Sequence, residues 1–166
     1  MLHDHFRTLA RFNAWANTQI YDAVGALPEG EYEKTRSAAY FGSIHGSLNH
    51  LLVVDRLWFG RVEGVDRGIT SLDQILHDGF DALRRAREAE DTRIIALVDG
   101  LEEAALGADL SYSSLAGDPY AMPLRIVLAA VFNHQTHHRG QVHALLKEAG
   151  AEPPALDIPV YWLTGR

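Results

Sequence analysis

Apolar side chains recur every three or four residues along four stretches of the chain. This spacing is the period of one face of an α-helix. The pattern predicts four long helices, over residues 2–27, 43–62, 71–101 and 123–149. The second helix has an unusually broad apolar face, which is typical of a helix that packs against two neighbours.

Residues that favour helix ends flank these stretches. Ser43 is a suitable N-cap for the second helix. Ser71 and Gln74 have the spacing of a capping box and predict the start of the third helix. Pro123 suits the first turn of the fourth helix, and Gly150 suits its C-terminal end.

The remaining segments have no helical period. Residues 107–122 predict a small hairpin or an irregular loop around a turn at Gly117 and Asp118. Residues 151–166 carry three prolines, which predicts an extended tail with a short turn. No internal repeat or domain boundary appears, so we expect residues 1–166 to form a single all-α domain, a four-helix bundle.

Composition narrows the function. The chain has 166 residues, of which 47% are hydrophobic, enough for one domain with a sizeable core. Its formal charge of −7 argues against a nucleic-acid partner, which would need a basic face. With no Cys, the chain has no disulfide, thiolate nucleophile or Cys-based metal site.

The sequence also carries a prediction about location. No basic segment followed by an apolar run opens the chain, and no apolar run approaches ~20 residues. We therefore expect a cytoplasmic protein that does not associate with a membrane.

The nine histidines are the residue type in excess. His134 and His138 are four residues apart and fall in the middle of the apolar stripe of the fourth helix, with Gln141 on the same face. Buried imidazoles need partners for their nitrogens, and a divalent metal ion satisfies both rings. Histidines that are exposed or satisfied by protein partners are the alternative.

The second helix offers a third ligand. His50 borders its apolar face, and metal sites in helical bundles use inward side chains from facing helices. We expect Asp55 to form a structural ion pair; the alternative is that it orients one of the metal ligands. We expect Trp58 to lie in the core. His45 is five residues before His50 and points away from it.

Other polar residues receive less specific roles. His137 flanks the stripe, so we expect it either to contact a ligand residue or to lie at the surface, and not to bind the metal ion. We expect Arg139 to pair with an acidic group on a neighbouring helix. The mixed charges of residues 84–93 predict a solvated face. We expect the remaining histidines to be solvated: His3, His5, His77 and His143.

Four segments of the chain carry a resemblance to a known family. They cover residues 12–17, 43–58, 133–141 and 153–157, and the most specific is the stretch from His138 through Gln141. The sequence resembles the DinB family along nearly its whole length. The resemblance implies an up-down-down-up four-helix bundle, often dimeric, in which one divalent metal ion, zinc or nickel, is bound by His50, His134 and His138.

The resemblance also suggests chemistry. Members of the family include transferases that use small thiols. Three histidine ligands leave a coordination position open for a thiol, water or a substrate oxygen. The predicted function is thiol transfer to an electrophile or hydrolysis, with a small-molecule substrate and a homodimeric protein. No general base is identified; Asp55, His137 and Gln141 are candidates.

A non-catalytic protein is the competing hypothesis. It would be a metal-binding dimeric bundle that acts in stress response or as an interaction module. A fourth protein ligand such as Asp55 or Gln141 would favour it, because structural zinc sites are usually closed by four protein ligands.

Overall fold

A computed structural model of the chain describes residues 1–164. The elements, in chain order, are α1 (Leu2–Gly25), α2 (Ile44–Glu63), α3 (Phe80–Asp99), the 3₁₀ helix η1 (Glu103–Gly107), β1 (Asp109–Ser113), β2 (Pro119–Pro123), α4 (Leu124–Glu148) and α5 (Ile158–Thr164). The described chain is therefore mostly helical and contains one small antiparallel sheet. The sheet corrects the expectation of a purely all-α protein.

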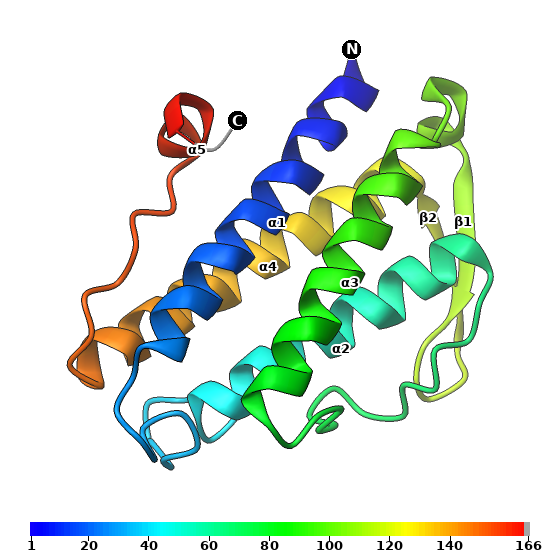
Figure 1. The fold of residues 1–166 in the computed structure, drawn as a ribbon. Helices are drawn as coiled ribbons and strands as arrows, with labels where there is room; N and C mark the ends of the chain where they lie inside the picture. Colours follow the sequence, from blue (N-terminus) through cyan, green and yellow to red (C-terminus); the bar gives the residue numbers. More distant parts are fainter. Residues whose placement is uncertain (165–166) are drawn as a thin grey trace.

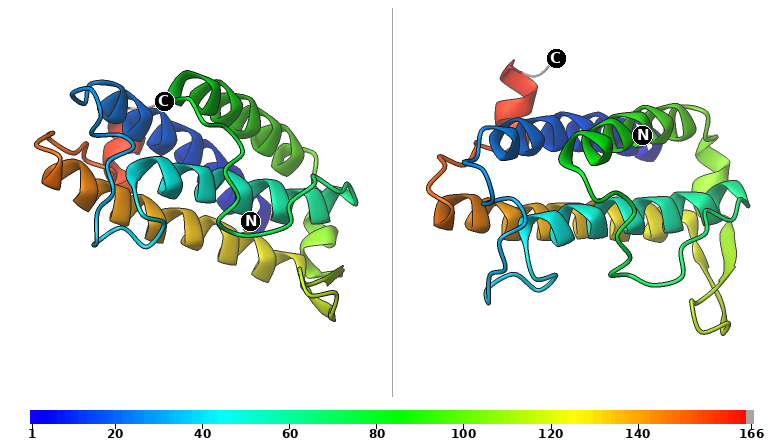
Figure 2. Two further views of the ribbon diagram at one scale, coloured as in Figure 1. Left: turned by 90° about the horizontal axis from the view of Figure 1, so that it is seen from below. Right: turned by 60° about the horizontal axis from the view of Figure 1, so that its bottom comes forward.

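The four long helices lie in two layers. Figure 2 shows α1 and α3 side by side above α2 and α4. Helices α1 and α4 run in one direction, and α2 and α3 run in the opposite direction (Figure 1). The long connection over residues 64–79 is needed because α2 and α3 are parallel, so the chain must return along the length of α2 before α3 begins.

The core of the described chain contains two large apolar clusters with a polar layer between them, and a small third cluster where α5 meets α1. One cluster gathers side chains such as Ile20, Leu48 and Val142, and the other gathers side chains such as Phe59 and Val131. Between them, every long helix contributes buried polar side chains: Asn13, Asn17, Asp55, Arg87, Asp91, Gln135 and Arg139.

This polar layer corrects part of the prediction that residues 84–93 form a solvated face: Arg85, Glu88 and Thr92 are exposed as expected, whereas Arg87, Glu90 and Asp91 are buried. Arg87 is only 2% exposed and forms ion pairs with Asp55 at 2.7 Å and Asp91 at 2.9 Å. Asp91 also accepts hydrogen bonds from the side-chain amide of Asn17. Arg139 donates to the side-chain amides of Asn13 and Asn17 and to the hydroxyl of Thr136, so its direct hydrogen-bond partners are uncharged rather than the acidic group we expected.

The start of the third helix was predicted wrongly. Helix α3 begins at Phe80, and Ser71 and Gln74 lie in the irregular connection before it. The side-chain oxygen of Gln74 accepts hydrogen bonds from the backbone N–H and the hydroxyl of Thr70, which makes a local turn and not a helix cap. By contrast, Ser43 does cap α2, because its hydroxyl accepts a hydrogen bond from Gly46 N at 3.0 Å.

The segment before the last long helix is the hairpin that we considered. Strands β1 and β2 pair in register from Asp109 opposite Pro123 to Ser113 opposite Pro119. Gly117 has a φ of +92° in the connecting turn, a conformation that glycine adopts without strain. Pro123 precedes the first residue of α4, and Gly150, with a φ of +84°, follows its end.

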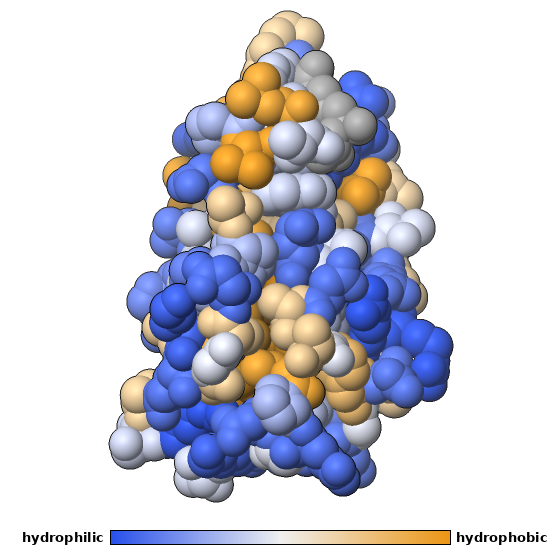
Figure 3. Space-filling model, turned by 60° about the vertical axis from the view of Figure 1, so that its left-hand side comes forward, coloured by the Kyte–Doolittle hydropathy of each residue, from blue (hydrophilic) through white to orange (hydrophobic). Residues whose placement is uncertain are grey.

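The predicted tail contains one more helix. Residues 151–157 are extended, and α5 then packs its Tyr161 against Phe12 and Trp15 of α1; residues 165–166 lie outside the described chain. α5 leaves Ile158 and Leu163 exposed, and Figure 3 shows apolar side chains gathered at this end of an otherwise mixed face. Within residues 1–164, no helix has the length and apolar character that crossing a membrane requires.

Candidate metal centre

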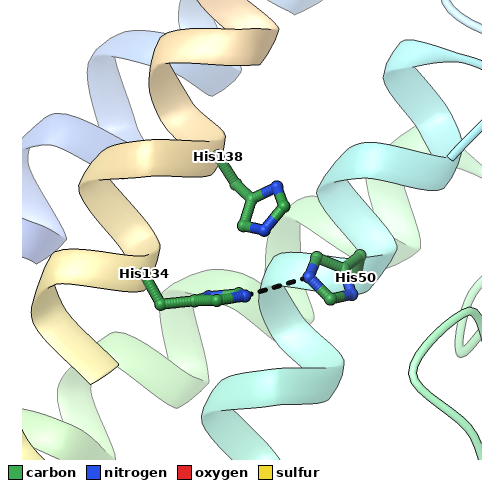
Figure 4. A group of neighbouring side chains, drawn as sticks. All are labelled: His50, His134 and His138. Atoms are coloured by element: carbon green, nitrogen blue, oxygen red, sulfur yellow. Dashed lines mark hydrogen bonds between the residues drawn. The ribbon is translucent and has the colours of Figure 1, made fainter. Parts of the chain in front are cut away.

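Three histidines from two helices converge on one point. His50 projects from α2, and His134 and His138 project from neighbouring turns of α4 (Figure 4). One nitrogen from each ring lies within 4.8 Å of the others, and Nε2 of His50 is 3.1 Å from Nε2 of His134. The ring centroids are 4.3–5.0 Å apart. These are the three residues that the sequence analysis selected as ligands.

The second nitrogen of two of these rings is held by the protein. Nδ1 of His50 is 2.7 Å from the carbonyl oxygen of Leu72, which can only accept, so Nδ1 carries the proton. Nδ1 of His138 donates to Oε1 of Gln141 at 2.8 Å. Both contacts leave the Nε2 lone pair free toward the centre of the cluster, which is how proteins orient histidine ligands.

His134 differs from the other two. Its Nδ1 is buried and has no hydrogen-bond partner within residues 1–164. The hydrogen-bond partner of this ring in the described chain is Nε2 of His50. Because His50 carries its proton on Nδ1, its Nε2 can only accept, so Nε2 of His134 is the donor in the absence of a metal ion.

The environment favours the neutral form of all three rings. Burial lowers the pKa of His50 to about 4 and that of His134 to about 3, and the neighbouring imidazoles lower the latter further. Burial also lowers the pKa of His138, although the hydrogen bond from its ring to Gln141 raises this pKa in part. Neutral imidazole is the form that binds a metal ion.

The donor set fits a divalent transition metal. Nitrogens that each lie ~2.0–2.1 Å from one zinc ion are separated by roughly 3 Å, close to the spacing of the Nε2 atoms of His50 and His134. The cluster could therefore hold a metal ion, with imidazole ligands that suit zinc, copper, iron or nickel.

An aromatic ring covers one side of the cluster. Phe41 stacks on His50 with ring centroids 3.8 Å apart and an angle of 19° between the planes, and it lies 5.7 Å from His138. Gly46 makes this arrangement possible, because a Cβ there would lie 2.1 Å from the carbonyl oxygen of Phe41. Phe41, Leu72 and neighbouring side chains line a surface cavity of ≈ 580 Å³ beside the cluster.

Two residues that were candidates for a fourth ligand have other partners. Asp55 is completely buried, pairs with Arg87, and accepts a hydrogen bond from Gln135 Nε2 at 2.7 Å. This confirms the structural ion pair. Gln141 uses its oxygen for His138 and its amide nitrogen for His137 Nε2, at 3.1 Å. His137 is exposed and contacts the cluster through Gln141 and the edge of the His138 ring.

The other histidines differ from their predicted roles in several cases. His5 is exposed as expected, but His3, His77 and His143 are half-buried, and His3 Nε2 lies 2.7 Å from the carbonyl oxygen of Val98. Trp58 packs against the second apolar cluster, as its predicted core position requires, and it is half-buried because its ring also contacts Tyr112 of the hairpin at the edge of a pocket.

Two residues that position the site were missed. Oδ1 of Asn49 accepts hydrogen bonds from the backbone N–H groups of Leu76 and His77, and Nε2 of His45 lies 2.9 Å from the carbonyl oxygen of His77. They fasten the 64–79 connection to α2, and this connection carries the Leu72 carbonyl that orients His50. The signal was a buried Asn next to His50, on a helix of otherwise apolar character.

The fold and this cluster together define a mostly helical protein with a candidate three-histidine metal centre. Residues 1–164 match the family model described as the DinB family, and the chain belongs to that family. Protein DinB of Bacillus subtilis (strain 168) is 27% identical over 160 residues, which cover 92% of this chain and 91% of that protein.

A solved structure shares the fold. The crystal structure of a DinB-like protein from Bacillus cereus ATCC 10987 matches with a TM-score of 0.65, over 85% of this chain and 90% of that one. The two sequences are 19% identical, so this likeness concerns the fold alone.

Proposed function

We propose that His50, His134 and His138 bind one divalent metal ion, zinc or nickel, and that the protein is an enzyme that transfers a small-molecule thiol to an electrophile. The observation that carries the proposal is the occupation of Asp55 and Gln141 by other partners. With these two side chains engaged, three protein ligands remain, and such a set leaves a coordination position for a reactant.

The chemistry follows from the donor set. A divalent ion bound by three neutral imidazoles acts as a Lewis acid and lowers the pKa of a bound thiol or water. The protein's own contribution is to keep the rings neutral by burial and to fix two of them through Leu72 and Gln141. Since the chain contains no Cys, the thiol must come from a co-substrate.

Hydrolysis is the second candidate, because the same open position accepts water. The non-catalytic alternative predicts a bound metal ion without turnover.

We also propose an architecture and a class of partners. Residues 1–166 form one domain, and the long helices form an up-down-down-up four-helix bundle. The protein is a homodimer whose partners are small molecules and neither nucleic acid nor a membrane.

One experiment separates these possibilities. Protein loaded with zinc, nickel or cobalt is mixed with a panel of low-molecular-weight thiols and monochlorobimane, which does not label a thiol of the protein because the chain has none. A metal-dependent rate that His134→Ala abolishes and His143→Ala retains supports thiol transfer. A rate only with an activated ester supports hydrolysis, and a stoichiometric metal ion without either rate supports the non-catalytic protein.

A further inference from the structure

A pocket further along α2 from the histidine cluster has the composition of a ligand site. It has a volume of ≈ 320 Å³ and lies between the C-terminal half of α2, the hairpin and the 64–79 connection. We name it the Arg61 pocket. Its lining consists of Leu57, Trp58, Arg61, Leu72, Tyr112, Ser114, Leu115 and Tyr120.

The Arg61 pocket lies on the face of α2 that carries His50. At ~100° per residue, Leu57 and Arg61 both fall within roughly 20° of His50 around the helix, and they are about 10 and 16 Å further along its axis. Leu72 connects the two places directly, since its side chain lines the pocket and its carbonyl oxygen holds Nδ1 of His50.

The walls of the Arg61 pocket are aromatic and apolar. Trp58 meets Tyr112 edge to face with ring centroids 5.0 Å apart, and Tyr112 stacks on Tyr120 at 5.8 Å. Leu72, Leu115 and Tyr120 are 46%, 44% and 52% exposed, so apolar surface remains available to a ligand.

Arg61 is a half-buried cation without a counter-ion in the described chain. Its guanidinium lies 4.5 Å from the ring centroid of Trp58 and 4.7 Å from that of Tyr112, and Nη2 donates to the carbonyl oxygen of Ser113 at 2.7 Å. No Asp or Glu of residues 1–164 forms an ion pair with it. Burial lowers its pKa, as expected for a charge that has lost water without gaining an anion.

Arginines that line another cavity do have a counter-ion, which distinguishes them from Arg61. The cavity between α1, α3 and α5 is also lined by arginines, Arg7 and Arg11, but both of these pair with Asp99. Their charge is already neutralised by the protein. Arg61, by contrast, donates one hydrogen bond, to Ser113, contacts two aromatic rings and forms no ion pair within residues 1–164, so its other N–H groups can donate to a ligand.

We propose that the Arg61 pocket binds the carboxylate end of an elongated apolar substrate whose other end reaches the three histidines. This inference rests on the proposed function, because it assigns the substrate class of the same site. The net charge of −7 would repel such an anion over long range, so recognition depends on this one guanidinium and on the apolar walls.

The test uses thiol probes of defined length on cobalt-loaded protein. Mercaptoundecanoate and mercaptoundecanol differ only in the terminal anion, and mercaptopropionate is too short to span the two places. The cobalt–thiolate absorption band reports binding at the metal. We expect mercaptoundecanoate to bind about tenfold more tightly than mercaptoundecanol, because a charge-assisted contact is among the strong ones.

Variants locate the effect. Arg61→Gln should reduce the advantage of the carboxylate to less than about threefold, Arg61→Lys should keep part of it, and Arg85→Gln, at an exposed position of α3, should leave it unchanged. Mercaptopropionate should bind all variants alike. Equal affinity for the acid and the alcohol in the wild-type protein, or an advantage that survives in Arg61→Gln, would overturn the proposal.

A second measurement separates this inference from the proposed function. Undecanoate and undecanol are titrated into metal-free protein by calorimetry with the same variants. If no cobalt–thiolate band forms, the proposed function fails, and a preference for undecanoate that depends on Arg61 then still supports the carboxylate site. Absence of that preference in the metal-free protein as well would overturn it.

Discussion

The polar layer and the partly buried histidine cluster lie at the same level of α4 and differ in how their polar atoms are satisfied. In the polar layer, Asp55, Arg87 and Asp91 are joined by ion pairs. In the histidine cluster, Nε2 of His50 and Nε2 of His134 are hydrogen-bonded to each other, and residues outside the cluster hold only the outer nitrogens of His50 and His138.

Adjacent residues of α4 supply both groups. Gln135 follows His134 and donates to Asp55 and to the carbonyl oxygen of Leu51, and Arg139 follows His138 and reaches Asn13 and Asn17 of α1. The difference indicates a division of roles. The polar layer fixes how the helices pack, and the histidine cluster keeps donor atoms available to a ligand.

The largest expected effect is on the polar layer. Arg87→Met leaves Asp55 and Asp91 buried without their cation and should lower the free energy of unfolding by about 3–5 kcal/mol, the range for breaking a buried ion pair. Urea denaturation measures this, with Arg85→Met as the exposed control, expected within about 0.5 kcal/mol of wild type. A loss below about 1 kcal/mol would mean that the layer does not stabilise the fold.

The next effect concerns the histidine cluster alone. Gln141→Leu removes the acceptor of His138 Nδ1–H and should weaken metal binding by about 10–100-fold, as for other outer partners of histidine ligands. Gln141→Glu keeps an acceptor and should restore most of the affinity. Competition with a chelator gives the affinities. Equal metal affinity in Gln141→Leu and wild type would contradict the role of Gln141.

In metal-free protein, the contributions of the two groups to the free energy of unfolding should also change in opposite directions with pH. The pKa values of about 4 for His50 and about 3 for His134 lie below ~6.5 for an unfolded histidine, so the unfolded state binds more protons and stability falls as pH drops below 6.5. Burial raises the pKa of Asp55 to about 6, so its protonation favours the folded state as pH drops toward 4.

Denaturation at several pH values checks this opposition. His134→Ala should flatten the loss of stability between pH ~6.5 and ~4, and Asp55→Asn should steepen it. The slopes are compared, since Asp55→Asn also lowers stability at every pH by leaving Arg87 with one carboxylate fewer. A steeper loss of stability with falling pH in His134→Ala than in wild type would contradict the lowered pKa of His134.

The smallest effect is expected for His137. This exposed ring contacts Gln141 and the edge of His138 but has no nitrogen in the cluster, so His137→Ala should change metal affinity by less than about threefold. The chelator competition used for Gln141 measures it. A loss as large as that of Gln141→Leu would place His137 among the residues that hold the metal.

Helical periodicity predicted the four long helices, although not the start of α3, and it placed His134 and His138 on one face of α4 and His50 beside the apolar face of α2. That the three histidines form one set was implied by the resemblance to the DinB family, because periodicity within one helix does not show which residues of another helix lie nearby. Ser71 and Gln74 misled the prediction of α3, because the connection is held by Asn49 and His45 of α2, and contacts between distant segments leave no local pattern.

The polar layer could have been predicted in part. Arg87 lies on the same stripe as Leu83, Ile94 and Val98, so its burial follows from helical spacing once the mixed charges around it are set aside. Its partner Asp55 is on another helix, and that pairing depends on how α2 and α3 pack. No pattern within one helix supplies this information.

The central claim is that the three histidines bind one metal ion. A crystal of protein loaded with zinc, measured on both sides of the zinc absorption edge, tests it most directly. We predict one anomalous peak per chain, ~2.0–2.1 Å from Nε2 of His50, His134 and His138, with no fourth protein ligand. A saturated crystal without a peak at these rings, or with Asp55 or Gln141 turned in as a fourth ligand, would contradict the account.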